Sequence, residues 1–478
     1  MIDTDILDSF RAILGMRRVV TNADDIAPWL TDWRGRYHGS SAAILEPHTV
    51  EEVAAIVRLA RERGVPLVPQ GGNTSMVGGA TPPADGRALI LSLRKMNTIR
   101  SIDIDANEAV CEAGVILSTL HEAAIGVERR FPLSLGAKGS ATIGGLISTN
   151  AGGTQVIRHG TMRGLVLGIE AVLPDGSIYD GLASLKKDNR GYDIKQLLIG
   201  AEGTLGVITA ATLRLAPAIT ESMTVWVGLS SPTEALTLLR WLQGRLGPVI
   251  EGFEVAAGEC LANVLAHIPG ARSPIASQTP WHALIDIDLS GTGTVGRERA
   301  EAALLTFLEW PGAIDATIAQ NETQASEFWR LRESISEAER AARVSLPYDI
   351  SVPVDTMPAF MVEAAEAVKG RFPGASGTAF GHLGDGNVHF HVCVPGDREE
   401  ASQWVGKHGH EVSRFVNDLV IAAGGSISAE HGIGQMKRAE LGRTASPAQL
   451  HGLRAIKAAL DPDGIMNPEK LIPLASEG

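Results

Sequence analysis

A polar, glycine-dense stretch of over thirty residues, Pro132 to Gly164, limits most strongly how this chain can fold. It reads PLSLGAKGSATIGGLISTNAGGTQVIRHGTMRG, and small side chains dominate it. So few large side chains cannot bury enough apolar surface to form a core of their own. The stretch must therefore pack against something that supplies the missing contacts, and a long, flat, polyphosphorylated cofactor would do so.

A second glycine-rich loop comes earlier in the chain. A capping box of Thr49 and Glu52 predicts a helix that ends at Gly64, and a short strand from Val65 to Val68 then leads into PQGGNTSMVGGATPP. Such a loop lets backbone N–H groups approach an anionic group, in particular a phosphate, where side chains would be in the way. The alternative interpretation is a plain mobile loop.

Size and composition exclude several classes of protein. The 478 residues predict two or three domains, and 44% hydrophobic with 20% charged residues is typical of a globular protein. A net charge of -13 argues against nucleic acid or an anionic membrane as a partner. Three widely spaced cysteines indicate no disulfide framework, and no run is long and apolar enough for a membrane span. We expect a soluble, cytoplasmic protein.

The pattern changes after Pro217, where we place a domain boundary. Beyond it, longer helices alternate with amphipathic strands, which predicts an antiparallel sheet covered on one face by helices. Two long helices are expected, Glu322 to Val344 and Glu400 to Ala423. The expected strands are Val249 to Glu254, Leu284 to Leu289, Asp349 to Val354, a central hairpin, and Ser426 to Ala429.

The central hairpin, AFGHLGDGNVHFHV, carries His382, His389 and His391. Its turn, Gly384 to Asn387, predicts positive φ angles and should bring His382 and His389 face to face. An isolated histidine is more often a core residue than a ligand. Several in one hairpin, with Glu430 and His431 following in SAEHGIG, favour a divalent-metal site instead.

One other motif in the sequence matches a cofactor-binding pattern. Residues 291 to 296 read Gly-Thr-Gly-Thr-Val-Gly between a strand and a helix, with Asp315 about 20 residues later, as an NAD-binding fingerprint requires. The preceding strand argues against this interpretation, because Asp286 and Asp288 alternate with apolar residues. The first strand of a dinucleotide fold is instead apolar on both faces.

Six motifs together resemble the FAD-dependent D-2-hydroxyacid dehydrogenases of the vanillyl-alcohol-oxidase superfamily, in register from about Trp33 to Leu471. The hydroxyglutarate-oxidising members are the most similar. The resemblance implies an α+β chain with a two-lobed FAD-binding domain of the PCMH type over residues 1–217. An antiparallel-sheet substrate domain covered by helices would follow over 218–478 and end in a short helical segment. The six motifs are PQGGNTSMVGG, LGAKGSATIGGLISTNAGG, IGAEGTLGVIT, GHLGDGNVHFH, SAEHGIGQMKR and DPDGIMNPEK.

The resemblance also implies the cofactor contacts. Ser75 and Met76 stand where a covalent attachment residue would be sought, so non-covalent FAD is expected. The positions that match the family's flavin contacts are Gln70, Gly71, Gly72, Asn73, Thr74, Ser75, Gly78, Pro132, Leu135, Gly136, Ser140, Thr142, Gly144, Gly145, Asn150, Ala151, Gly153, Glu202, Gly203, Ile208 and Asn467.

In the substrate domain the resemblance implies a divalent metal, zinc, bound by His382, His389 and Glu430, with His431 as the catalytic base. A metal with open positions can take the substrate's carboxylate and hydroxyl and lower the hydroxyl pKa, and the flavin accepts the hydride. The positions that match substrate contacts are Arg332, Ser336, Asn387 and His391.

Two departures bear on the substrate. Pro347 stands where hydroxyglutarate-oxidising members usually carry a lysine, and His391 replaces a common asparagine. The loss of the lysine's positive charge weakens the case for a substrate with a second carboxylate. The expected activity is oxidation of a D-2-hydroxy acid, D-2-hydroxyglutarate first and D-lactate or glycolate as alternatives, with electrons passing to an acceptor such as an electron-transfer flavoprotein. An oxygen-using oxidase, a flavin subunit of a multi-chain enzyme and a homodimer all stay open.

Overall fold

The computed structural model describes residues 2–473, and these residues fall into two compact units. The first unit contains residues up to Gly153, Gly160–Ala218 and the chain from Glu430 onward. The second contains Thr154–His159 and Ile219–Ala429. The major change of unit after Ala218 lies next to the predicted boundary at Pro217. The chain's last segment, however, belongs with the first unit rather than with the predicted second domain.

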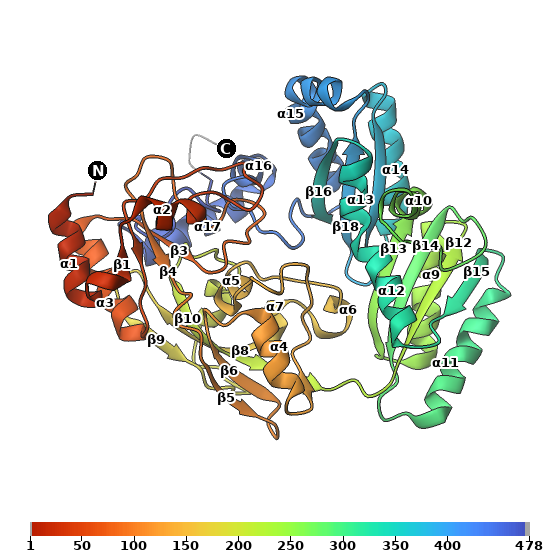
Figure 1. Cartoon of the computed structure of the whole chain (residues 1–478), viewed down its shortest axis with the longest axis horizontal. Coiled ribbons are helices and arrows are strands. Elements are labelled where there is room, and N and C mark those ends of the chain that lie inside the picture. The colour runs from red at the N-terminus through yellow and green to blue at the C-terminus, as the bar shows by residue number, and fades with distance from the viewer. Residues whose placement is uncertain (1, 474–478) are drawn as a thin grey trace. The chain divides into compact units, whose positions relative to one another are not determined.

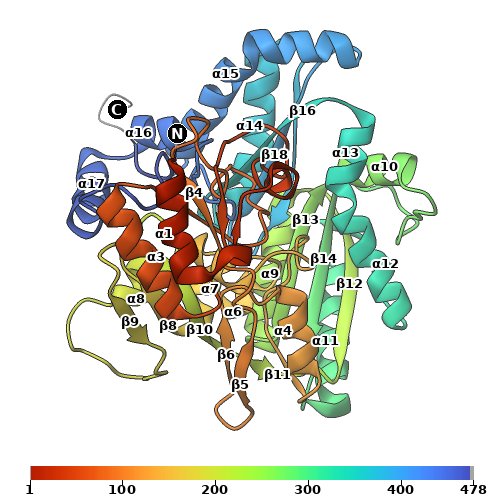
Figure 2. The same cartoon turned by 60° about the vertical axis from the view of Figure 1, so that its left-hand side comes forward.

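The first unit begins with a small sheet in the order β1-β2-β4-β3, in which β2, β4 and β3 run parallel. Helices α1 and α3 lie side by side and pack on it (Figure 2). Half of the predicted capping box is present at the start of α3: Thr49 accepts a hydrogen bond from the Glu52 N–H at 3.2 Å, but the Glu52 carboxylate accepts from the His48 N–H at 2.8 Å instead of from Thr49. The predicted end of the helix at Gly64 is confirmed, with φ 62°. The elements are α1 (Thr4–Leu14), β1 (Val19–Val20), α2 (Ala23–Ile26), β2 (Ile44–Leu45), α3 (Val50–Arg63), β3 (Leu67–Gln70) and β4 (Leu89–Ser92).

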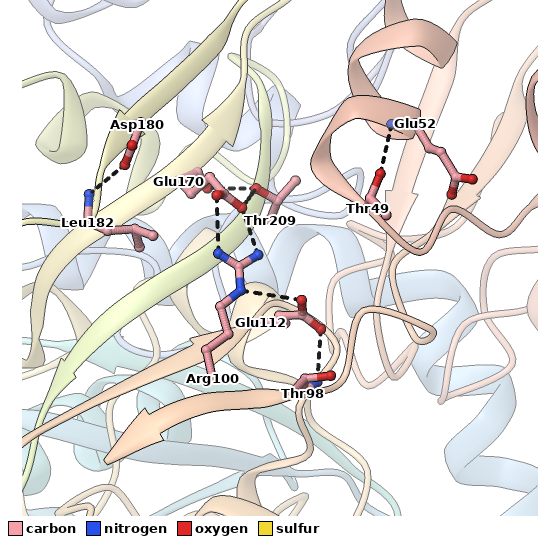
Figure 3. A network of polar contacts seen from close by, with 9 residues as sticks. All are labelled: Thr49, Glu52, Thr98, Arg100, Glu112, Glu170, Asp180, Leu182 and Thr209. Atoms are coloured by element: carbon pink, nitrogen blue, oxygen red, sulfur yellow. Dashed lines mark hydrogen bonds and ion pairs between the residues drawn. The ribbon is translucent and has the colours of Figure 1, made fainter. Parts of the chain in front are cut away.

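A second, antiparallel sheet of the first unit has the order β5-β6-β10-β8-β9. Arg100 on β5 binds both Glu112 on β6 and Glu170 on β8, and Glu170 also accepts a hydrogen bond from Thr209 on β10 (Figure 3). One partly exposed polar network thus ties four strands together. The elements are β5 (Ile99–Asp103), β6 (Glu108–Glu112), α4 (Leu117–Ile125), β7 (Arg129–Arg130), α5 (Ile143–Ser148), α7 (Met162–Leu165), β8 (Val166–Val172), β9 (Ile178–Gly181), α8 (Ile194–Leu198), β10 (Val207–Arg214) and β11 (Ala216–Pro217).

The C-terminal segment completes the first unit through α16 (Arg438–Thr444) and α17 (Pro447–Leu460). Beyond α17 the chain pairs with β3: the Leu67 N–H donates to the Ile465 carbonyl at 2.8 Å, and the Asn467 N–H donates to the Leu67 carbonyl at 2.8 Å. The predicted helical C-terminal segment is confirmed, and Ile465 and Met466, which follow α17, belong to the core of the parallel sheet.

The second unit is built on a seven-stranded sheet in the order β15-β12-β14-β13-β17-β18-β16, with every neighbouring pair antiparallel. Figure 1 shows β13, β14 and β12 side by side within it. The elements are α6 (Val156–His159), β12 (Ser222–Leu229), α9 (Pro232–Leu246), β13 (Ile250–Ala257), α10 (Gly258–His267), β14 (Trp281–Asp288), α11 (Gly293–Leu308), β15 (Ala313–Ile318), α12 (Glu322–Glu333), α13 (Ile335–Ala342), β16 (Ser345–Ser351), α14 (Met357–Arg371), β17 (Ser376–His382), β18 (Asn387–Cys393) and α15 (Arg398–Ala422).

Helices cover both faces of this sheet, which corrects the expectation of a single covered face. One face packs on α9, α11, α14 and α15, and the other packs on α10, α12 and α13. The predicted helix Glu322 to Val344 is in fact two, because α12 ends at Glu333 and α13 begins at Ile335. The predicted strand at Ser426 to Ala429 is a single bridge, Ser426 to Ser351.

The structure argues against the NAD-binding interpretation of residues 291–296. The preceding strand, β14, pairs antiparallel with both β12 and β13, whereas a dinucleotide fold needs a parallel strand followed by a crossover helix.

Candidate functional site

The predicted histidine hairpin is present as β17 and β18. The Gly386 N–H donates to the His382 carbonyl at 3.1 Å and the Asn387 N–H donates to the Asp385 carboxylate at 2.9 Å, which closes the turn. Of the turn's four residues only Gly386 has a positive φ, 83°. The pairing is Phe380 with His389 and His382 with Asn387, so the two imidazoles are diagonal rather than direct neighbours. Their ring centroids are still only 5.3 Å apart.

Strand alternation sends all three histidines to one face of the sheet. Val388, Phe390 and Val392 point into the core under α14, so His389 and His391, one residue along, point to the opposite face. Their cross-strand partners on β16, Asp349 and Pro347, share that face. A strand of alternating histidines therefore builds a polar, largely buried surface that we call the histidine face.

Glu254 on β13 is an almost completely buried acid of the histidine face, with 1% of its surface exposed. One carboxylate oxygen lies 2.6 Å from His382 Nδ1, and the other accepts from Arg332 Nε at 2.8 Å and pairs with Nη2 at 2.7 Å. Burial by itself raises the pKa of the Glu254 carboxyl, but the charges of His382 and Arg332 outweigh it and hold that pKa below its ordinary value. Sequence reasoning missed this residue, although the two acids in the strand IEGFEVAA, Glu251 and Glu254, were the available signal.

Two predicted substrate contacts are already engaged within the protein. Arg332 uses its Nε and Nη2 on Glu254, and its guanidinium lies 4.8 Å from the Phe380 ring centroid. Asn387 donates its amide to Asp349 and to the Ile350 carbonyl, each at 3.0 Å. A substrate carboxylate would therefore have to bind Arg332 at a different edge of the guanidinium. Ser336 lies half-buried on α13, one residue from the start of that helix.

His391 contacts a fully buried acid, Glu339 of α13, through Nδ1. The Cys260 thiol lies beneath them, 3.4 Å from the Thr378 hydroxyl. Burial raises the pKa of Cys260 above its ordinary value, so this thiol stays protonated and inert. His391 thus belongs to a buried polar network. Its presence where the family commonly carries asparagine changes more than a single hydrogen-bonding side chain.

Glu430 and His431 begin the segment that returns the chain to the first unit. Glu202 holds this segment: its two carboxylate oxygens accept from the Ile433 and Gly434 N–H groups at 2.7 and 2.8 Å. Burial raises the pKa of Glu202 to about 7, although the two backbone donors oppose the rise. Glu202 was expected to contact the flavin, and within the first unit its visible role is to anchor the residues that follow Glu430 and His431.

The predicted flavin positions of the first unit do come together. A Cβ on Gly71 would lie 2.1 Å from the Thr142 hydroxyl, and one on Gly72 would lie 1.9 Å from the Ser140 carbonyl oxygen. The two glycine-rich segments therefore touch each other, and close backbone packing, as well as phosphate approach, requires their glycines.

These positions also fit the expected FAD. Buried polar atoms of Gln70, Thr142 and Asn467 (Oε1, Oγ1 and Oδ1, respectively) have no hydrogen-bond partner among the described residues. Four of the predicted contacts that are not glycine, Asn73, Asn150, Glu202 and Asn467, have positive φ, which is a costly conformation for such residues. Unmet acceptors and strained backbone at the predicted contacts are what a bound FAD would explain.

Comparison with known proteins gives two domain matches. Residues 41–181 match an FAD binding domain, and residues 220–471 match the C-terminal domain of FAD linked oxidases. The second match covers the whole seven-stranded sheet. No helix within residues 2–473 is long and apolar enough to cross a membrane.

Curated relatives resemble the chain over nearly its full length. It is 38% identical to the mitochondrial D-2-hydroxyglutarate dehydrogenase of Arabidopsis thaliana, over 99% of this chain and 82% of that protein. The Bos taurus mitochondrial enzyme of the same name is 38% identical over 95% and 81%. The D-2-hydroxyglutarate dehydrogenase of Stutzerimonas stutzeri is 36% identical over 98% and 99%.

Solved structures support the fold alone. p-Cresol methylhydroxylase with substrate bound superposes with a TM-score of 0.74 at 17% identity, covering 98% of this chain and 96% of that one. Alkyldihydroxyacetonephosphate synthase gives a TM-score of 0.74 at 16% identity, covering 98% and 86%. The expected architecture, a two-lobed FAD-binding domain followed by an antiparallel-sheet domain, is confirmed.

Proposed function

Because the chain belongs to the FAD-linked oxidases and is an FAD-dependent oxidoreductase, we propose that it oxidises a D-2-hydroxy acid to the 2-oxo acid. D-2-hydroxyglutarate is the first candidate, since the relatives carry that name over nearly the whole chain. Bound FAD supplies the hydride acceptor. The electrons then pass to a separate acceptor such as an electron-transfer flavoprotein, and we propose that this takes place in the cytoplasm.

The observation that carries the proposal is the close pair of imidazoles, His382 and His389, on a buried acidic face. Glu254, Asp349 and Asp286 lie on this face, Glu339 of α13 contacts it, and Arg332 binds Glu254 through its guanidinium. Burial raises the pKa of Asp286 to about 6, which illustrates how costly the local negative charge is. An anionic 2-hydroxy acid would be repelled there unless a cation compensates.

We propose that His382, His389 and Glu430 hold a divalent metal, zinc. Ser426, four residues before Glu430, pairs with Ser351 through N–H to carbonyl bonds of 3.0 and 2.8 Å, and Ser351 pairs with Asn387 of the hairpin. Four extended residues span at most roughly 13 Å, so the covalent chain keeps Glu430 near the hairpin's turn end. Two imidazoles and a carboxylate are a donor set that leaves positions open for substrate. A bound divalent ion lowers the pKa of an α-hydroxyl.

The chain's own residues then have distinct tasks. His431 takes the hydroxyl proton, as an imidazole with a pKa near the working pH can. Arg332 binds a substrate carboxylate through Nη1, because Nε and Nη2 remain on Glu254. Ser336, Asn387 and His391 complete the substrate contacts that we propose.

A second candidate substrate class has an observation of its own. Pro347 pairs directly with His391 across β16 and β18, on the histidine face, where a lysine would supply a cation. The His391 to Glu339 contact adds a buried acid instead. This arrangement favours a substrate without a second carboxylate, such as D-lactate or glycolate.

The test is anaerobic mixing of the holoenzyme with D- and L-2-hydroxyglutarate, lactate, malate and glycolate, followed by bleaching of the flavin absorbance. We expect bleaching by a D-2-hydroxy acid. Reduction by none of the compounds would refute the proposal. Admitting air afterwards separates a dehydrogenase from an oxidase, because only an oxidase reoxidises rapidly. A single purified chain that is active with a dye acceptor excludes an obligatory partner subunit.

A further inference from the structure

The three histidines of the histidine face share one feature that the proposed chemistry does not require. Each presents its Nδ1 to a carboxylate: His382 to Glu254 at 2.6 Å, His389 to Asp349 at 3.8 Å, and His391 to Glu339. For His382 and His389 the acid is the residue directly opposite in the neighbouring strand. The register of the sheet therefore delivers the carboxylates to the imidazoles.

We propose that Glu254 is a positioning residue that orients both a metal ligand and the substrate-binding arginine. One of its oxygens accepts from Nδ1 of His382, which makes Nε2 the ligand atom, and its other oxygen holds Arg332. The inference rests on the proposed function, because it assumes a cation at His382 and a substrate carboxylate at Arg332.

The geometry of Glu254 supports this double role. Glu254 and His382 are direct cross-strand partners of β13 and β17, so their side chains leave the sheet on the same face. The 2.6 Å contact of Glu254 with His382 fixes which ring nitrogen carries the proton, and thereby the orientation of the imidazole. A hydrogen bond to a carboxylate also makes the other nitrogen a better donor to a metal.

Burial makes a carboxylate at position 254 depend on its partners. Glu254 is 1% exposed and lies between His382 and the Arg332 side chain, which is 11% exposed, so its charge keeps one partner when the other is removed. A neutral glutamine at position 254 keeps the shape and can still accept from Nδ1, but it loses the charge that strengthens His382 as a ligand. The alternative is that Glu254 and Arg332 form a purely structural ion pair.

Three variants of the FAD-loaded, metal-stripped enzyme separate these interpretations. Glu254→Gln removes the charge, and Arg332→Gln removes the other half of the ion pair while leaving Glu254 on His382. Asp286→Asn is the matched control, because Asp286 is a half-buried acid of the same face on the adjoining strand, bound to Thr224 and Trp329 instead. The readout is the dissociation constant for Zn²⁺, measured by competition with a chromophoric chelator, with FAD content and thermal midpoint as checks of folding.

We expect Glu254→Gln to weaken Zn²⁺ binding by about 10- to 100-fold, and the other two variants to stay within about twofold of the wild type. Excess Zn²⁺ should restore kcat of Glu254→Gln while KM for substrate stays raised, since Arg332 has lost its partner. If Glu254→Gln does not retain FAD, Glu254→Asp, which withdraws the carboxylate by one methylene, should weaken Zn²⁺ binding in the same direction.

Three other outcomes would each contradict the proposed role of Glu254. Equal Zn²⁺ affinity in Glu254→Gln and wild type would overturn the role of Glu254 and leave the metal site standing. Equal losses in Arg332→Gln and Glu254→Gln would identify a structural ion pair and also overturn it. A wild-type enzyme that binds no Zn²⁺, Mn²⁺ or Co²⁺ would remove the proposed metal site and this inference together.

Discussion

At the scale of single residues, buried acids carry much of what is specific to this chain. Glu254, Glu339 and Glu202 are each almost completely buried, and each is held by a named partner. A buried charge without a partner costs several kcal/mol. A buried acid with a partner therefore indicates a position where the fold maintains a polar site.

His431→Ala tests the proposed base. The variant should keep FAD, because His431 is not among the expected flavin contacts, but substrate should no longer reduce the flavin at a measurable rate. Loss of a general base typically costs about 10²- to 10⁴-fold. Stopped-flow absorbance at the flavin band measures the rate, and an unchanged rate would remove His431 from the mechanism.

Glu202 predicts a pH dependence of stability. Its pKa is about 7 in the folded protein against an ordinary value of 4.5, so the folded state binds the extra proton between these values. This carboxyl therefore stabilises the fold below pH 4.5, and that contribution is lost as the pH rises to 7. Above pH 7 its contribution no longer changes. The contribution of Glu202 to the free energy of unfolding differs by about 3 kcal/mol between the two ends of this range.

Glu202→Gln should abolish that pH dependence, because the amide does not titrate. The thermal midpoint of the variant should rise relative to wild type between pH 4.5 and 7 and run parallel to it above pH 7. Parallel curves across the whole range would show that Glu202 has an ordinary pKa and that burial is compensated by its two backbone donors.

At the scale of elements, the hairpin β17–β18 is the unit that turns a sequence pattern into a site. Its strands alternate core side chains with His389 and His391, and its turn places His382 beside them. Gly386 is required at this turn for two reasons, its φ of 83° and the Val352 carbonyl oxygen that would lie 2.1 Å from a Cβ.

Gly386→Ala should therefore destabilise the enzyme by more than the about 1 kcal/mol that a positive φ alone costs, and should weaken Zn²⁺ binding through the displaced turn. Gly424→Ala is the control, since Gly424 has φ 73° and nothing within 4 Å of a Cβ. Chemical denaturation measures both. Equal losses of stability would mean that the turn absorbs the methyl group without strain.

At the scale of the whole molecule, the chain leaves and re-enters its first unit twice. Thr154–His159 and Ile219–Ala429 belong to the second unit, and the residues from Glu430 return to the first. The expected ligand Glu430 thus stands directly at a change of unit, so the proposed metal site depends on long-range folding rather than on one element.

Metal removal tests this dependence. Dialysis against a strong chelator should abolish substrate oxidation while the bound flavin spectrum persists, because the flavin positions lie in the first unit and the histidines in the second. Adding back Zn²⁺ or another divalent ion should restore activity. Full activity of an enzyme shown by elemental analysis to be metal-free would contradict the proposed chemistry.

The sequence by itself determined the features that depend on neighbours along the chain. Alternation predicted the hairpin of His382 and His389, a capping box predicted the start of α3, and the small-residue stretches predicted a long, polyphosphorylated cofactor in the first half of the chain. These signals are local, since the strand period of two and the turn residues are set by backbone geometry.

Only the tertiary structure decided which side chains meet across the sheet. Glu254 and His382 are 128 residues apart, and their contact follows from the register of β13 and β17, which no local pattern encodes. For the same reason, the sequence did not show that Arg332 binds Glu254 or that Glu339 is buried. It also did not show that helices cover both faces of the sheet. Strand pairing is chosen by the packing of the whole core, so partners distant in the chain become visible only when the fold is complete.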